Sequence, residues 1–282
     1  MALQNHTLPV SVGRTGESRA WWSLDPSGKL LMFIHGFGGC ATKTWRFFPK
    51  LLVTDHAFSG CDLLFYAYDS RRASAFASVE VLFEFLDPFL SNPAYLINHD
   101  VDLKRSWDFR HSSIYIITHS LGAPIARKML LKARENRSTW LSKVKIVSYA
   151  PATAGARAEE SLRSAGRQGI PLLTLLYSWF IYNWPVVDDL RCGSAFLTKL
   201  HSETDLAILS DGGTVFQSSG TFFGEHENVV DLKQELPWDS PYTIIPDKDH
   251  FSICKPRRPQ DAVYLHLKRL VTKERRSQTA DR

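Results

Sequence analysis

The sequence predicts an α/β protein in which helices cover both faces of a mostly parallel sheet. Short, uninterrupted apolar runs alternate along the chain with longer segments whose apolar residues recur at helical spacing. An uninterrupted apolar run is expected for a strand that is buried on both faces, and its alternation with helices indicates a parallel sheet. No internal repeat and no linker divides the 282 residues, so we expect one domain over residues 1–282.

The predicted elements follow one another in a simple order. Residues 30–34 and 114–117 are the clearest buried strands, because both runs are apolar throughout. Residues 92–112 are polar and mixed in character, and we expect a surface connection there. Strands are predicted at 19–24, 30–34, 63–68, 114–117, 144–149, 214–217 and 242–245, and helices at 44–52, 73–90, 121–135 and 259–271.

Residues 155–200 do not follow this alternation, and we expect them to form a helical lid inserted over the sheet. Within them, residues 170–187 carry no charge and just reach the lower length limit of a membrane-spanning helix. Pro171, Asn183 and Pro185 interrupt this stretch. The interruptions favour a buried or interfacial segment over a membrane span.

The net charge of +5 is concentrated at the C-terminus. Residues 255–282 carry nine Lys or Arg against three Asp or Glu, so the rest of the chain is close to neutral. We expect a solvated basic tail that is frayed over residues 273–282. No nucleic-acid-binding motif accompanies the charge, so we predict no nucleic-acid partner.

Nothing in the sequence indicates a metal or a cofactor, and we predict neither. The four cysteines are scattered without a C-x-x-C pair, which argues against a zinc site and against a dense disulfide framework. The first 22 residues contain no apolar secretory core, so the expected location is the cytoplasm. Peripheral membrane contact through the lid or the basic tail is the alternative, and no oligomeric state is predicted.

The segment around Ser120 has the pattern of a reactive serine on a sharp turn. The apolar run 114–117 leads into THSLG at residues 118–122, and a helical pattern follows. A buried strand, a tight turn and a helix in this order form a nucleophile elbow. The helix N-terminus offers backbone amides that favour a developing negative charge. We therefore predict that Ser120 is a nucleophile.

A serine nucleophile needs a base to take its proton, and the base is held by a third group. Ligands of a parallel sheet bind beyond the carboxyl ends of its strands, so the base should follow a late strand. His250 lies a few residues after the last predicted strand, whereas His266 falls inside the closing helix. His250 is therefore the predicted base.

Three sequence blocks together carry a family resemblance. They are HGFGG at residues 35–39, THSLG at 118–122 and DHFSICKP at 249–256. With these blocks in this order, the chain resembles serine α/β-hydrolases, in particular the lipase-like branch that includes GPI inositol-deacylases and serine-active-site lipid-remodelling hydrolases. The resemblance spans nearly the whole chain and implies the α/β-hydrolase fold. Thr118 and Ala123 depart from the usual glycines of this elbow, and the nucleophile assignment is kept because Thr is tolerated in this branch.

The resemblance also implies the groups that assist Ser120. The backbone amides of Phe37 and Leu121 would form the oxyanion hole, with Gly36 and Gly38 allowing the loop to come close to the substrate carbonyl. The G-x-G-x-x-G and G-x-x-x-x-G-K-[ST] patterns of phosphate-binding loops are absent, so a phosphate role for this loop is not expected.

The acid is the least determined member of the predicted site. Glu227 precedes a Val-Val pair, as the acid does in the family segment that this stretch resembles. Asp205, Asp211 and Glu225 remain alternatives. Asp249 stands too close to His250 in sequence to reach the distal ring nitrogen.

We predict a serine esterase that cleaves a carboxylic ester through an acyl-enzyme on Ser120. The uncharged part of the lid, where Trp179, Phe180 and Trp184 are the expected substrate contacts, favours a hydrophobic or lipid-like acyl group. A thioesterase or a peptidase would use the same residues. An inactive relative that binds a membrane or a protein is the alternative from a different functional class.

Overall fold

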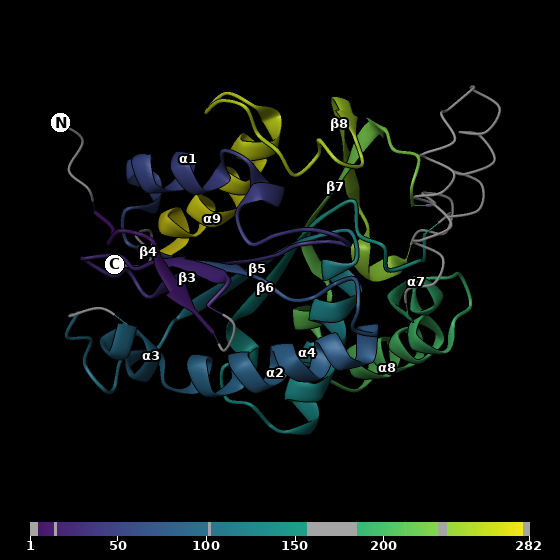
Figure 1. The fold of residues 1–282 in the computed structure, drawn as a ribbon, viewed down its shortest axis with the longest axis horizontal. Coiled ribbons are helices and arrows are strands. Elements are labelled where there is room, and N and C mark those ends of the chain that lie inside the picture. Colours follow the sequence, from purple (N-terminus) through teal and green to yellow (C-terminus); the bar gives the residue numbers. More distant parts are fainter. Residues whose placement is uncertain are drawn as a thin grey trace.

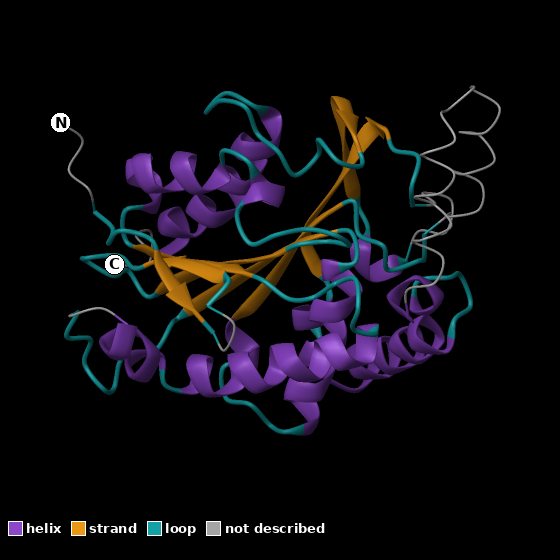
Figure 2. Cartoon of the chain, viewed as in Figure 1, coloured by secondary structure: helices purple, strands orange, loops and turns teal. Residues whose placement is uncertain are grey.

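The computed structural model describes residues 5–13, 16–100, 103–156, 185–211, 213–230 and 236–278. Within them, an eight-stranded sheet runs through the centre of the molecule in the order β1-β2-β4-β3-β5-β6-β7-β8 (Figure 1 and Figure 2). The strands are β1 (Val10–Val12), β2 (Ser18–Trp21), β3 (Lys29–Ile34), β4 (Cys61–Tyr66), β5 (Ser113–His119), β6 (Val144–Tyr149), β7 (Ser218–His226) and β8 (Tyr242–Asp249).

The sheet is parallel from β4 to β8 and antiparallel only at the edge formed by β1 and β2. All residues of β4 and β5 are buried, as are all but the first of β3. Strands with no exposed side need helices on both faces, which explains their uninterrupted apolar runs. The prediction of a mostly parallel sheet between two helical layers is confirmed.

Helices form a layer on each face of the sheet. Figure 1 shows α1 and α9 on one face and α2, α3, α4 and α8 on the other. Apolar residues of α4 and α9 face the sheet: Ile125 and Met129 of α4, and Val263 and Leu267 of α9, are all buried. The helices are α1 (Phe48–Thr54), α2 (Ala75–Ser91), α3 (Pro93–Asp100), α4 (Gly122–Glu135), α7 (Pro185–Asp189), α8 (Ala195–Asp211) and α9 (Ala262–Gln278).

The expected surface connection at residues 92–112 is wrong in part. It contains α3, and two of its polar side chains are buried against Asp62 of β4. Arg105 Nη2 lies 2.7 Å from Asp62 Oδ1, and His111 Nε2 lies 2.9 Å from Asp62 Oδ2. One buried carboxylate therefore pairs with two side chains that the composition of this stretch places on the surface.

The boundaries of two late elements also differ from the prediction. Residues 214–217 hold a 3₁₀ turn, Thr214–Phe216, and strand β7 begins only at Ser218. The apolar signal at this point came from Phe216, which is buried in the turn. Helix α9 continues through Gln278 and so includes part of the basic stretch 273–282.

The connection between β6 and β7 contains α7 and α8, and the expected lid at residues 155–200 falls within it. Residues 157–184, which include most of the uncharged stretch, lie outside the described residues. An Asp189 carboxylate oxygen in α7 accepts a hydrogen bond of 2.7 Å from the Ala75 amide at the start of α2. In the part of the chain that the structure describes, no helix is both long and apolar enough to cross a membrane.

A buried ion pair holds α4, the helix that follows Ser120, against the β6–β7 end of the sheet. Arg127 Nη2 donates to Asp239 Oδ1 at 2.8 Å, and both side chains are almost fully buried. The Asp239 carboxylate also accepts hydrogen bonds from Ser218 at the start of β7 and from Thr153 after β6. A single carboxylate thus joins three segments around the elbow.

We expect Asp239→Ala to lower the free energy of unfolding by about 3–5 kcal/mol, because it leaves the Arg127 cation buried without its partner. Glu80→Gln is the matched control, since Glu80 pairs with Lys132 on the surface and an exposed pair contributes about 0–1 kcal/mol. Urea unfolding of both variants measures the difference. An equal decrease in the free energy of unfolding in the two variants would contradict the role given to Asp239.

Candidate active site

Ser120 stands on a strained turn between β5 and α4. Its φ is 51°, in the left-handed region that residues with a side chain rarely adopt. Gly122 packs so closely on β3 that an added Cβ would lie 2.4 Å from the Ile34 carbonyl oxygen. These two features define the strand–turn–helix geometry that the sequence predicted for this segment.

Backbone hydrogen bonds fix the turn on the neighbouring strand. The Ser120 amide donates to the Tyr149 carbonyl at 3.1 Å, and the Ser120 carbonyl accepts from the Ala152 amide at 3.2 Å. Thr118, which replaces the usual glycine, is fully buried and donates its hydroxyl to Ser148 Oγ at 3.1 Å. The departure from glycine is therefore accommodated by a polar partner on β6.

His250 lies beyond the carboxyl end of β8, where it meets Ser120. The distance from His250 Nε2 to Ser120 Oγ is 3.0 Å. The Asp249 carboxylate accepts the amides of Phe251 and Ser252 and so shapes the turn that presents the imidazole. Asp249 thus supports the loop rather than the ring.

Glu227 follows β7 and contacts the other side of the same imidazole. His250 Nδ1 lies 3.0 Å from Glu227 Oε1 and 3.1 Å from Oε2. Glu227 Oε1 also accepts the amides of Val229 and Val230 at 2.8 and 3.1 Å. The carboxylate is fully buried and held by the Val-Val pair that drew attention to it in the sequence.

The pKa of Glu227 reflects opposing effects. Burial alone would raise it, but the hydrogen bond and charge of His250, together with the two valine amides, bring the pKa below its usual value. A carboxyl group with a lowered pKa is ionised at neutral pH and accepts the Nδ1–H of the imidazole. The remaining ring nitrogen is then the one that faces Ser120.

Two of the rival acids, Asp205 and Glu225, make no hydrogen bond or ion pair with His250 within the described residues. Asp205 lies on the exposed side of α8. Glu225 is exposed, and its Oε2 accepts the Asp247 amide at 3.1 Å. The side chain of Asp211 lies outside the described residues.

The glycine loop after β3 lies directly beside Ser120. A Cβ added to Gly36 would come 2.9 Å from Ser120 Cβ, so only glycine permits this approach. Gly38 has a φ of 64°, and its amide donates to Ser70 Oγ at 2.9 Å. Phe37 lies between these glycines, on the segment that the sequence assigned to the oxyanion hole.

Leu121 is the first residue of the turn into α4, and no described residue accepts a hydrogen bond from its amide.

His119 is a site residue to which the sequence pattern assigned no role. Its Nε2 donates to the His250 carbonyl at 2.8 Å, which links the elbow directly to the loop that carries His250. Burial lowers the pKa of His119 to about 3, so the ring is neutral and its single N–H is available for this bond. Its place immediately before Ser120 was the only sequence signal for it.

Among the described residues, one exposed group has the side-chain types of a metal site. Potential ligand atoms of Glu225, His226 and Asp247 lie within 4.8 Å of one another. The Glu225 carboxylate already accepts a backbone amide, and all three residues are exposed, so this geometry assigns no metal. The predicted substrate contacts Trp179, Phe180 and Trp184 lie outside the described residues.

The three-dimensional structure is similar to solved structures of lipid-active enzymes. The mature lipase BlEst2 of Bacillus licheniformis aligns with a TM-score of 0.53 at 14% identity, over 86% of this chain and 93% of that one. The Paleococcus ferrophilus monoacylglycerol lipase aligns with a TM-score of 0.51 at 12% identity, over 90% of this chain and 98% of that one. The phospholipase PlaB of Legionella pneumophila gives 0.58 at 15% identity, over 86% of this chain and 59% of PlaB.

Sequence comparison adds no closer relative. No protein-family model matches the chain, and no curated protein sequence matches it. The narrower likeness to GPI inositol-deacylases therefore stays a prediction from the sequence blocks. The sheet order, the elbow geometry and the similar structures agree on one architecture: the chain has the α/β-hydrolase fold.

Proposed function

We propose that the protein is a serine hydrolase that cleaves carboxylic esters with a hydrophobic acyl group. The observation that carries this proposal is the continuous hydrogen-bonded series from Ser120 Oγ, through both nitrogens of His250, to the Glu227 carboxylate. This arrangement suits a serine nucleophile, a general base and an acid that orients the base.

In the proposed reaction, Ser120 Oγ attacks the ester carbonyl while His250 Nε2 takes the hydroxyl proton. Ionised Glu227 stabilises the imidazolium that forms and keeps the ring in the required orientation. The amides of Phe37 and Leu121 bind the oxyanion, and each such donor typically lowers the barrier by about 3 kcal/mol. His250 then protonates the departing alcohol. A water molecule, deprotonated by His250, attacks the acyl-enzyme in the same way and releases the carboxylic acid and free Ser120.

Two further observations support an apolar substrate. Phe251 follows the base directly, is 60% exposed and places its ring 5.3 Å from the His250 ring, centroid to centroid. An exposed aromatic ring at the rim of a site offers an apolar surface to an incoming chain. The names of the similar structures, a lipase, a monoacylglycerol lipase and a phospholipase, belong to those proteins and point to the same substrate class here.

Esters of one alcohol with acyl chains from acetyl to palmitoyl test this proposal. We expect hydrolysis by the wild-type protein, with kcat/KM rising from acetyl to medium-length chains. Ser120→Ala should lower kcat by at least about 10⁴-fold, because the reaction loses its nucleophile. Matched thioesters and amides in the same assay identify a thioesterase or a peptidase instead.

Variants of the acid refine the same experiment. We expect Glu227→Gln to reduce kcat by about 10²- to 10⁴-fold, whereas Glu225→Gln, Asp205→Asn and Asp211→Asn should stay within about threefold of wild type. Similar kcat values in all four variants would reject Glu227 as the acid. Full hydrolysis by Ser120→Ala, or none of any acyl compound by the wild type, would reject the proposed function.

The lowered pKa of Glu227 also predicts how stability depends on pH. The unfolded chain, with a Glu pKa of about 4.3, binds a proton before the folded chain does as the pH falls. The stabilisation from ionised Glu227 is therefore complete above the unfolded pKa and is lost as the pH falls through the folded pKa. Urea unfolding between about pH 7 and pH 3 should show the difference between wild type and Glu227→Gln shrinking on acidification. A difference that grows on acidification contradicts this assignment.

A further inference from the structure

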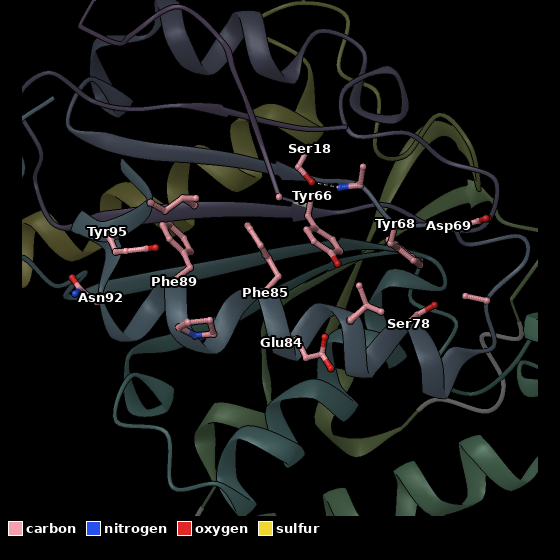
Figure 3. A pocket seen from close by; sticks show the side chains of 16 residues that line it. Ser18, Tyr66, Tyr68, Asp69, Ser78, Glu84, Phe85, Phe89, Asn92 and Tyr95 are labelled. Atoms are coloured by element: carbon pink, nitrogen blue, oxygen red, sulfur yellow. Dashed lines mark hydrogen bonds between the residues drawn. The ribbon is translucent and has the colours of Figure 1, made fainter. Parts of the chain in front are cut away.

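A second concave site lies away from Ser120, between the edge of the sheet and the helices α2 and α3. It is a cavity of about 420 Å³, and its lining residues come from β4, α2, α3 and the segment around β1 and β2 (Figure 3). Neither Ser120 nor His250 lines it. Its volume falls within the range of small-molecule sites, which are typically about 300–1,000 Å³.

A row of aromatic rings forms one wall of this cavity. Figure 3 shows Tyr66 and Tyr68 reaching in from β4 and its extension, and Phe85 and Phe89 from α2. Neighbouring rings are nearly parallel: centroids are 6.1 Å apart for Tyr68 and Tyr66, 5.4 Å for Tyr66 and Phe85, and 6.1 Å for Phe85 and Phe89. The lining runs along α2 from Ser78 to Asn92, a helix length of about 20 Å, so the cavity suits an elongated apolar molecule.

Two polar atoms of the lining residues are buried and lack hydrogen-bond partners within the described residues. Ser78 is only 3% exposed, and its Oγ has no hydrogen-bond partner. Asn92 Oδ1, at the opposite end of α2, is also buried without one. Buried polar atoms in native proteins are almost always satisfied, so these groups indicate a ligand that hydrogen-bonds to them.

The charge of the lining limits the kind of ligand. Asp69 and Glu84 contribute carboxyl groups, and none of the described lining residues is Lys, Arg or His. A fatty-acid carboxylate or a phosphate group would therefore find no cation to pair with among the described lining residues. A neutral polar group such as a hydroxyl needs no such partner.

We propose that this cavity binds a neutral, elongated lipid-like molecule, with its apolar chain along the aromatic wall and its hydroxyl group at Ser78. This proposal does not depend on ester hydrolysis. The site stands beside the glycine loop, because Tyr68, at one end of the cavity, donates its hydroxyl to the His35 carbonyl at 2.8 Å.

Calorimetric titration of 1-decanol into the Ser120→Ala protein tests the proposal without turnover. We expect saturable binding of one molecule per chain. Decanoate, which has the same chain length and a negative charge, should bind at least about tenfold more weakly. Ser78→Ala removes the buried hydroxyl with little change in shape and should weaken decanol binding by about fivefold to tenfold.

A matched pair of tryptophan variants on α2 locates the binding. Val81 is 51% exposed and lines the cavity, so Val81→Trp should fill it and weaken decanol binding by at least about tenfold. Ala77 is exposed on the same helix and does not line the cavity, so Ala77→Trp should bind as the parent does.

Three results would overturn the proposal. They are the absence of decanol binding, undiminished binding in both Val81→Trp and Ser78→Ala, and decanoate binding as tight as that of decanol. Circular dichroism confirms that each variant is folded. Because Ser78→Ala is a small change, it decides the outcome even when Val81→Trp does not fold.

Discussion

The left-handed backbone of Ser120 is the constraint on which the rest of the site depends. A φ of 51° at a residue with a side chain costs about 1–3 kcal/mol and persists only where its surroundings hold it in place. Here the Tyr149 carbonyl and the Ala152 amide hold the backbone of Ser120, while Gly122 lies against β3. The turn places the hydroxyl at the carboxyl end of β5, on the edge of the sheet where the loops after β3, β7 and β8 begin.

The other groups meet Ser120 because a parallel sheet brings the carboxyl ends of its strands to one edge. Glu227 and His250 are the clearest case, since they follow two strands that are neighbours in the sheet. His119 strengthens the arrangement by donating from the elbow to the His250 carbonyl. The elbow and the loop that carries His250 are therefore joined twice, through the Ser120 side chain and through the ring of His119.

Burial gives these contacts their electrostatic character. The imidazole and the Glu227 carboxylate are both shielded from water. In such a buried environment a charge–dipole or charge–charge contact is stronger than at the surface. The same burial keeps His119 neutral, so two adjacent histidine rings do not repel each other as cations. One protonatable imidazole thus faces one ionised carboxylate.

Much of this arrangement could be predicted from local sequence patterns. The buried strands, the elbow and the position of His250 depend on apolar runs and chain order, which are readable residue by residue. Glu227 was suggested as the acid only by its likeness to a family segment, because nothing in the local sequence distinguishes it from Glu225. In the folded chain, Glu227 contacts the His250 ring, whereas Glu225 accepts the Asp247 amide.

Other features depend on contacts between distant segments and could not be predicted. Arg105 and His111 look like surface residues until Asp62, far away in sequence, is seen to pair with both. The strand expected at 214–217 was misplaced because a single buried residue, Phe216, gave an apolar signal in a 3₁₀ turn. The cavity between β4 and α2 is lined by segments that are distant in sequence, from Gly13 to Leu96, and no local periodicity reveals such a site.

The central claim is that Ser120 is a nucleophile activated by His250, and its most direct test is covalent. A fluorophosphonate reacts with an activated serine by forming a phosphorus–oxygen bond and releasing fluoride. Mass spectrometry of the treated protein should find one phosphonyl adduct, located on the peptide that contains Ser120 and absent from both Ser120→Ala and His250→Ala. No adduct on the wild-type protein, or an adduct that persists at another residue in Ser120→Ala, would contradict the account.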